Sequence, residues 1–433
     1  MPQTDLQLGT DRWLDHYMAA ALFLIPAIAL VAPTGYSWGA ALLLIGAVVT
    51  VFARQSLPQA WSPLPLLVKA IIGAMLIYAA VWIADAALRG EGVREFDRPS
   101  RFLFAALCLI AITQCRIHQA WLWAGLGVGG IATGAMAAWE KLVEGASRAS
   151  GTAQTIQFGN LAMMMGLMCL AGLLWAGTQH RHRVWQLFLS AGAIGGMSAS
   201  FFSGTRGAWL MPIVMGGIGL WAAMQQRRLR RYLWVAPVML AIVYGAAYLA
   251  PQTGVKSRVD TAATQVVRYF ADDQRGGSVG YRFEMWRGGW ILFTQSPVIG
   301  WGENAYIANL RALGEEGVIV KGASRFTHGH NDWINVLAKR GAVGALILLA
   351  LYGLPIVWFM RFGRRHDGDD ARGPSSYATQ RLALATAGLV LPSSFIVGGM
   401  TQVSLNHNSG AMMYAFMLAS LVGLSVNELG RER

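Results

Sequence analysis

Long apolar runs recur along this chain and are separated by short polar connections. A helix that crosses the hydrocarbon core of a bilayer needs roughly 20 mostly apolar residues, and about twelve runs approach that length. We therefore predict an all-α membrane protein with about twelve transmembrane helices. The predicted spans lie near 17–33, 36–53, 65–88, 101–116, 119–140, 157–177, 184–202, 206–224, 232–250, 340–360, 382–402 and 408–426.

Only one connection between these spans is long, and it runs from Pro251 to about Lys339. It divides the chain into three predicted parts. Transmembrane helices 1–9 occupy 1–250, a loop that carries the candidate chemistry occupies 251–339, and transmembrane helices 10–12 occupy 340–433. This loop gathers the charged, aromatic and histidine residues that the apolar spans exclude.

Two segments of the long loop have apolar residues at helical spacing, namely 257–270 and 281–294. We expect both to be amphipathic helices that lie on the bundle. Pro297 and the turn Gly300-Trp301-Gly302 end the second helix. In the fifth and seventh spans, glycines form small faces that favour close helix approach: Gly125, Gly127, Gly129, Gly130 and Gly134, with Gly192, Gly195 and Gly196.

The arginines in the short connections predict the orientation in the membrane. Basic residues favour the cytoplasmic side, and the richest basic connections follow the even-numbered spans. They contain Arg54, Arg116, Arg181 and Arg183, the arginines of 227–231, and those of 361–381. This places the N-terminus inside and the long loop outside. One basic connection opposes the rule, since it would face outward with Arg89, Arg94, Arg98 and Arg101.

The composition agrees with a membrane protein. Of the 433 residues, 55% are hydrophobic and only 13% are charged, whereas roughly a quarter of a soluble domain is charged. The formal net charge of +13 lies beside the predicted spans, so it favours anionic lipids or phosphorylated substrates over nucleic acid. No nucleic-acid-binding module is visible. The three cysteines lie in or next to apolar runs and predict buried thiols without a disulfide framework.

Arg206 lies between two apolar runs with almost no loop around it. A charged side chain at membrane depth costs about 3 kcal/mol unless it reaches the interface or finds a partner, so a functional role is the first hypothesis. The alternative is an interfacial anchor whose guanidinium reaches lipid headgroups.

Arg282 and Arg287 flank Trp286 in the second loop helix. Guanidinium groups match phosphate oxygens in a bidentate manner, so two or three converging arginines can hold a diphosphate without a metal. The alternative is a solvated charged face in which these arginines pair with Glu284.

His330 precedes Asn331 and Asp332, which are typical residues at the start of a helix. A histidine beside the positive end of that helix and near arginines stays neutral, which suits a general base. As a metal site, His328, His330 and Asp332 would supply ligands, but Gly329 and a helix that begins at Asn331 prevent a shared face. The third interpretation is a capping or hydrogen-bonding histidine.

These residues resemble those of a known family. Arg206 at the mouth of a span, Arg282-x-x-x-Trp286 followed by Pro297-x-x-Gly300-x-Gly302, and His330-Asn331 before a span are similar to the membrane O-antigen ligases of Gram-negative bacteria. Their superfamily also holds O-antigen polymerases and pilin oligosaccharyltransferases. The resemblance implies a GT-C-like glycosyltransferase of the bacterial inner membrane, with its active site in a periplasmic loop and without a metal or other cofactor.

The resemblance also implies the reaction and the role of each residue. A glycan moves from undecaprenyl diphosphate to a sugar hydroxyl of lipid A–core, with inversion at the anomeric carbon. His330 would be the base, and Arg206 and Arg282 would stabilise the departing diphosphate. Trp286, Arg287 and Asn331 are expected to contact substrate. For the phosphates of lipid A–core, we expect contacts with the outward basic connection that holds Arg94 and Arg98.

Three other functions stay open. A polymerase would use the same donor and differ only in its acceptor, and a pilin-type transferase would use a protein acceptor. A transporter for lipid-linked glycans belongs to another class; it predicts charged residues in the middle of several spans and broken helices in related halves. Lys69 and Asp85 in the third span have no matching pair in the other half, which disfavours transport.

Overall fold

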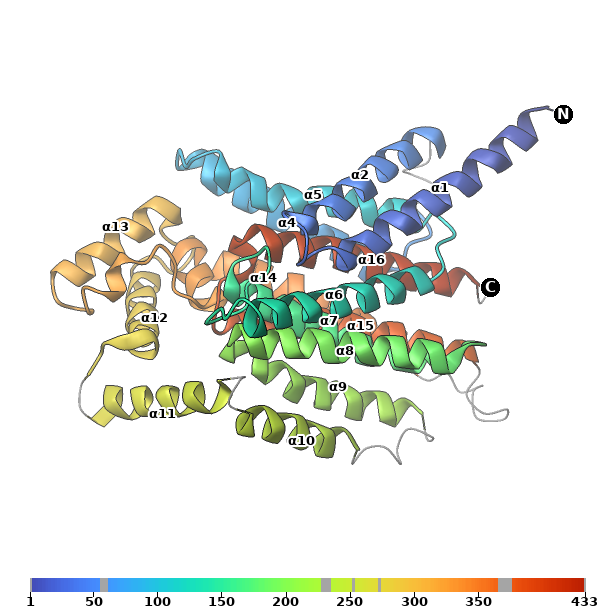
Figure 1. The fold of residues 1–433 in the computed structure, drawn as a ribbon. Helices are drawn as coiled ribbons and strands as arrows, with labels where there is room; N and C mark the ends of the chain where they lie inside the picture. The colour runs from blue at the N-terminus through green and yellow to red at the C-terminus, as the bar shows by residue number, and fades with distance from the viewer. Residues whose placement is uncertain are drawn as a thin grey trace.

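The computed structural model describes residues 2–54, 61–226, 235–250, 254–271, 274–364 and 376–431. Within these ranges all regular structure is helical, which confirms the expected all-α fold. Most helices run side by side in one long bundle, and the two chain ends lie at the same end of it (Figure 1).

Every predicted span overlaps a helix, but some boundaries differ widely: the first helix begins at Pro2 rather than near 17, and the helices predicted at 101–116 and 340–360 begin at Arg94 and Asp332. The bundle helices are α1 (Pro2–Ala27), α2 (Gly35–Arg54), α4 (Leu66–Leu88), α5 (Arg94–Ile112), α6 (Ala120–Leu142), α7 (Thr155–Ala176), α8 (His182–Ser203), α9 (Met211–Gln225), α10 (Val235–Leu249), α14 (Asp332–Phe362), α15 (Ser376–Gly399) and α16 (Asn408–Arg431). A short 3₁₀ helix, η1 (Arg206–Leu210), joins α8 to α9.

Eight helical segments of the described residues are long and apolar enough to cross a membrane. They are α2, α4, α6, α7, η1 with α9, α14, α15 and α16. The other four bundle helices fall outside this group; α5, for example, begins with the charged stretch Arg94-Glu95-Phe96-Asp97-Arg98. Several apolar helices therefore indicate a multi-pass membrane protein, and the count of twelve spans stays a prediction.

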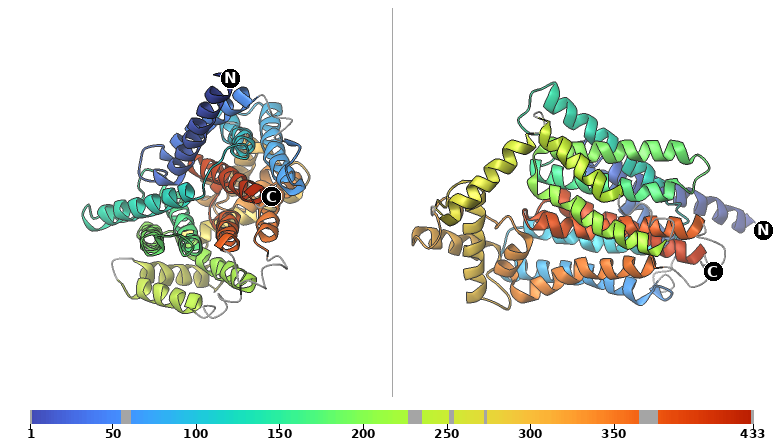
Figure 2. Two further views of the ribbon diagram at one scale, coloured as in Figure 1. Left: turned by 90° about the vertical axis from the view of Figure 1, so that its right-hand side faces the viewer. Right: turned by 90° about the horizontal axis from the view of Figure 1, so that it is seen from below.

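Three helices form the centre of the bundle. The apolar windows of α7, α15 and α16 are 83%, 89% and 89% buried. In the end-on view, α16 lies in the middle of the other helices (Figure 2, left). The glycine faces of α6 and α8 also meet as expected. A Cβ on Gly130 would lie 2.3 Å from the carbonyl oxygen of Gly192, so only glycine permits this approach.

The described part of the long loop contains three complete α-helices, which project from the end of the bundle opposite the chain ends (Figures 1 and 2). They are α11 (Val255–Ala271), α12 (Gly277–Gln295) and α13 (Gly302–Glu315). The two predicted segments are thus confirmed as helices, α11 and α12. Apolar and polar residues are separated on opposite faces of α11 but not of α12. The sequence interpretation missed α13, which begins directly after the predicted turn.

The turn between α12 and α13 docks into a break in α14. Gly341 has φ 59° and ψ −159°, so it interrupts the helix. The amide of Ala342 then donates to the carbonyl oxygen of Pro297 at 2.7 Å, and that of Val343 to Val298 at 3.2 Å. The first part of α14, which follows His330, is therefore fixed to the loop helices as well as to the bundle.

The orientation in the membrane remains a prediction. Residues 227–231 and most of the basic stretch 361–372, on which it partly rests, lie outside the described residues.

Candidate functional site

Arg206 is held at the junction between the bundle and the loop helices. It begins η1 just after Gly204, whose φ of 63° is the left-handed conformation that glycine adopts easily. The Arg206 guanidinium donates from Nη1 to the carbonyl oxygen of Arg258 at 3.1 Å and from Nη2 to Oγ of Ser278 at 3.2 Å. One end of the guanidinium thus binds α11 and the other binds the start of α12.

Arg258 of α11 packs against the same glycine. A Cβ on Gly204 would lie 2.5 Å from the guanidinium carbon of Arg258, so any larger residue would displace this arginine. Gly204 therefore supports two arginines: it turns the chain for Arg206 and leaves room for Arg258.

Arg148, in the connection between α6 and α7, is the third arginine at this junction. Its Nε donates to the carbonyl oxygen of Ser203 at 2.7 Å. Burial lowers the pKa of Arg148, and the positive charges of Arg258 and Arg206 lower it further. These two neighbours place Arg148 in the same electrostatic environment as Arg206.

Arg282 extends from α12 toward this group. Burial lowers its pKa first, followed by the charges of Arg206 and Arg148. We call Arg148, Arg206, Arg258 and Arg282 the arginine cluster. Among the described residues, no Asp or Glu forms an ion pair with any of the four. Positive charge without a counter-charge is the expected property of a site for a multiply charged anion.

His330 lies next to the arginine cluster, in the loop before α14. Burial lowers the pKa of its imidazole, the Arg282 charge lowers it further, and the hydrogen bond between Nδ1 and Oε1 of Gln402, 2.9 Å long, opposes the shift. The ring is therefore neutral at pH 7. The backbone of His330 has φ 46°, a conformation that non-glycine residues rarely adopt and that is common at functional sites.

The helix start next to His330 is formed as predicted. The side-chain oxygen of Asn331 accepts hydrogen bonds from the amides of Trp333 and Ile334 at 2.9 and 3.2 Å. This N-cap fixes the direction in which the chain leaves His330. The structure thus gives Asn331 a capping contact, and its expected substrate contact stays a prediction.

Trp286 contacts the same loop. Its indole Nε1 donates to the carbonyl oxygen of Gly329 at 2.9 Å, and its ring lies edge-on to that of Phe283, with centroids 5.6 Å apart. The side chain therefore links α12 to the residue before His330.

Arg287 does not join the cluster. It is exposed, and a residue five positions after Arg282 lies about 140° around the helix from it. Pairing of these arginines with Glu284 is not found either. Glu284 is fully buried and accepts hydrogen bonds from the hydroxyl of Tyr269 at 2.8 Å and the amide of Val320 at 2.9 Å.

The basic start of α5 reaches the surroundings of His330 through Arg98. Burial and then the charge of Arg98 lower the pKa of His407 to about 4. The His407 ring lies 6.2 Å from that of His328, which lies 4.3 Å from that of His330. Arg94, in contrast, is exposed at the first residue of α5.

Of the residues that the sequence suggested as metal ligands, His328 and His330 lie together, with ring centroids 4.3 Å apart. Across the described residues, no group of three or more His, Cys, Asp or Glu side chains is arranged to hold a metal ion. Asp332 is buried and accepts the amide of Ser404 at 3.2 Å.

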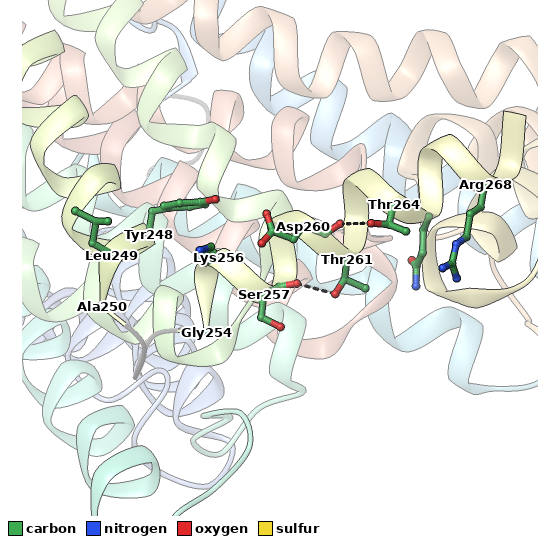
Figure 3. Close-up of a pocket in the computed structure, with 11 residues that line it drawn as sticks. Tyr248, Leu249, Ala250, Gly254, Lys256, Ser257, Asp260, Thr261, Thr264 and Arg268 are labelled. Carbon is green, nitrogen blue, oxygen red and sulfur yellow. Dashed lines mark hydrogen bonds between the residues drawn. The ribbon is translucent and has the colours of Figure 1, made fainter. Parts of the chain in front are cut away.

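An open groove of about 700 Å³ lies beside the cluster, between the end of α10 and α11. Lys256, Ser257, Asp260, Thr261 and Thr264 line it with polar groups (Figure 3). Another lining residue, Gln265, accepts the hydroxyl of Ser278, which in turn accepts a hydrogen bond from Arg206. The groove and the cluster thus share α11 as a wall.

The structure brings Arg206, Arg282 and His330 together from three distant parts of the chain. The fold and this site define a class: helical multi-pass membrane proteins with an arginine cluster beside a neutral histidine.

Comparison with known proteins indicates which family within this class the chain resembles. Residues 191–349 match the family model described as O-antigen ligase, which supports the assignment of this chain to the O-antigen ligase family. The matched segment runs from α8 into α14 and so contains Arg206, Arg258, Arg282 and His330. The chain is also similar to an uncharacterised protein of Haemophilus influenzae, with 24% identity over 388 residues, which cover 89% of this chain and 92% of the relative.

Proposed function

We propose that this protein is an O-antigen ligase, an inverting glycosyltransferase of lipopolysaccharide biosynthesis. Its donor is a glycan on undecaprenyl diphosphate, and its acceptor is a sugar hydroxyl of lipid A–core at the periplasmic face of the bacterial inner membrane. The observation that carries the proposal is an arginine cluster without counter-charge, next to a neutral histidine.

The arginine cluster binds the diphosphate of the donor. Arg206 and Arg282 supply the two guanidinium groups that the family resemblance implies. Arg148, in the connection before α7, and Arg258, in α11, add positive charge. A diphosphate leaves with more negative charge than it carries in the ester. Fixed guanidinium groups therefore stabilise the transition state more than the ground state.

His330 acts as the general base. Its neutral imidazole takes the proton from the acceptor hydroxyl while that oxygen attacks the anomeric carbon. A new carbon–oxygen bond forms on one face of the sugar, and the bond to the diphosphate oxygen breaks on the opposite face. The products are the glycosylated acceptor and undecaprenyl diphosphate, and the configuration at the anomeric carbon is inverted. A positioned base contributes typically 10²–10⁴-fold to such a reaction.

The acceptor approaches from the side of α5. Arg98, whose charge acts on His407, supplies a positive group for the phosphates of lipid A–core, and Arg94 lies exposed one turn earlier. Bilayer lipids surround the helices, so the lipid tails of both substrates remain in the membrane while their polar groups reach the loop.

An assay that offers different acceptors distinguishes a ligase from a polymerase, a pilin-type transferase and a transporter. Purified protein in vesicles is given lipid-linked glycan together with lipid A–core, a second lipid-linked glycan, or pilin. A ligase produces glycosylated lipid A–core. Longer lipid-linked glycan as the only product identifies a polymerase, and modified pilin identifies a pilin-type transferase. Glycan that crosses the vesicle membrane unchanged identifies a transporter.

Two controls belong to this assay. The His330→Ala variant is expected to insert normally and to lose product. Addition of EDTA is expected to leave the rate unchanged, since no step of the proposed mechanism uses a metal. Strong inhibition that a divalent ion reverses contradicts this mechanism.

A further inference from the structure

Gln402 lies in the segment after α15 and contacts His330 directly. Its side chain is only 1% exposed, and its Oε1 lies 2.9 Å from Nδ1 of His330. The same Oε1 accepts the backbone amide of Val403 at 3.1 Å. A backbone N–H can only donate, so the atom that faces His330 is the carbonyl oxygen of the amide group.

The orientation of the Gln402 amide determines which nitrogen of the His330 imidazole carries the proton. A carbonyl oxygen has no hydrogen to give, so Nδ1 of His330 must donate in the hydrogen bond. In a neutral ring the other nitrogen, Nε2, then carries the lone pair. Among the described residues, Nε2 makes no hydrogen bond, and the ring is half-buried.

The segment that carries Gln402 is itself held in place. The amide of Gln402 donates to the carbonyl oxygen of Gly398 at 3.0 Å, and the amide of Ser404 donates to Oδ2 of Asp332 at 3.2 Å. Asp332 follows His330 by two residues and is 3% exposed. The two partners of the Gln402–His330 hydrogen bond are therefore connected through a second, buried contact.

We infer that Gln402 is a positioning residue that selects the Nδ1–H tautomer of His330, so that Nε2 is the atom that accepts the proton from the acceptor hydroxyl. This inference rests on the proposed function and deepens it. An amide suits the role because it orients the ring without a negative charge. A carboxylate at this place would stabilise the imidazolium and hold the base protonated.

The pH dependence of activity tests the inference. The charged and titratable groups around His330 are Arg282 on α12, His328 in its own loop, Asp332 at the start of α14 and His407 before α16. In Gln402→Glu all of them stay in place, and only the amide becomes a carboxyl group. We expect the acid limb of the profile of kcat/KM against pH to move to higher pH.

Two further variants separate orientation from packing. Gln402→Leu keeps most of the side-chain volume but cannot accept a hydrogen bond. We expect kcat to fall about 10- to 100-fold, as for other partners that orient a functional histidine, while the KM for the donor is unchanged. Gln226→Glu is the control, since it makes the same change at a buried glutamine, which follows α9 directly and donates to Thr379 of α15. If Gln402→Glu keeps the pH profile of the unchanged protein, the inference is overturned.

A spectroscopic measurement does not depend on activity. Nitrogen-15 NMR of protein labelled at histidine distinguishes the two tautomers, and the His330 signals are identified by their loss in His330→Gln. The expected result is protonated Nδ1 with unprotonated Nε2, and a mixture of tautomers in Gln402→Leu. An Nε2–H tautomer in the unchanged protein refutes the inference, whereas absence of transfer to every acceptor refutes the proposed function alone.

Discussion

The indole of Trp286 donates a hydrogen bond of 2.9 Å to the carbonyl oxygen of Gly329. This contact joins α12, which carries Arg282, to the loop that carries His330. The distance between the leaving-group site and the base therefore depends on a tryptophan that the sequence suggested only as a substrate contact.

Replacement of Trp286 by phenylalanine removes this hydrogen bond and keeps an aromatic ring. A neutral hydrogen bond contributes about 1 kcal/mol, so we expect kcat to fall roughly 5-fold through a less well-placed His330. Initial rates at saturating donor measure the effect. Trp290→Phe on the same helix is the control, because Trp290 is 52% exposed. An equal loss in both variants would mean that the Gly329 contact has no special role.

The arginine cluster predicts that replacement of Arg282 lowers activity far more than replacement of Arg287. Each charged hydrogen bond contributes about 1.5–3 kcal/mol, so Arg282→Ala and Arg206→Ala are expected to lose roughly 10- to 100-fold or more in kcat/KM for the donor. Arg287→Ala is expected to retain activity, since its side chain is exposed on another face of α12. The readout is the amount of O-antigen on lipid A–core in cells and the rate with purified protein. Normal capping in Arg206→Ala or Arg282→Ala removes that residue from the mechanism.

The basic residues Arg94 and Arg98 at the start of α5 predict a binding site for the phosphates of the acceptor. In Arg98→Glu the reversed charge acts on His407, which lies in the surroundings of the base, so the KM for lipid A–core is expected to rise while the KM for the donor stays the same. Arg94→Glu tests whether the exposed arginine contributes as well, and a smaller rise is expected. An unchanged acceptor KM in both variants would exclude this surface as the acceptor site.

The two histidines beside His330 predict a loss of stability in acid. Burial lowers the pKa of His328 to about 3 and that of His407 to about 4, whereas an unfolded chain has a histidine pKa of about 6.5. The unfolded state therefore binds more protons below about pH 6.5, and the folded state loses stability as the pH falls toward 4.

Thermal unfolding in detergent between pH 7.5 and 4.5 measures this loss. The Tm is expected to fall with pH, and to fall less steeply in His407→Gln than in the unchanged protein. His180→Gln, which alters an exposed histidine, serves as the control. Equal slopes in all three proteins would show that His407 does not contribute.

Part of the site could be predicted because its signals are local. Arg206 is a charge between apolar runs, and Asn331 after His330 is a helix start, so both can be recognised within a few residues. Gln402, Arg148 and Arg258 could not be found in this way. A glutamine near the end of an apolar run and arginines in a loop have no distinguishing pattern, and their roles arise only from contacts across the fold.

The sequence by itself determined the all-α class, the long loop with two of its helices, and the candidate residues on each segment. Apolar runs have few stable alternatives to helices in a membrane, since backbone groups must be satisfied internally. Only the tertiary structure decided which arginines lie together, which face of α12 Arg287 occupies, and which nitrogen of His330 faces Gln402. Those properties depend on distances between segments that are far apart in the chain, and helical periodicity contains no information about such distances.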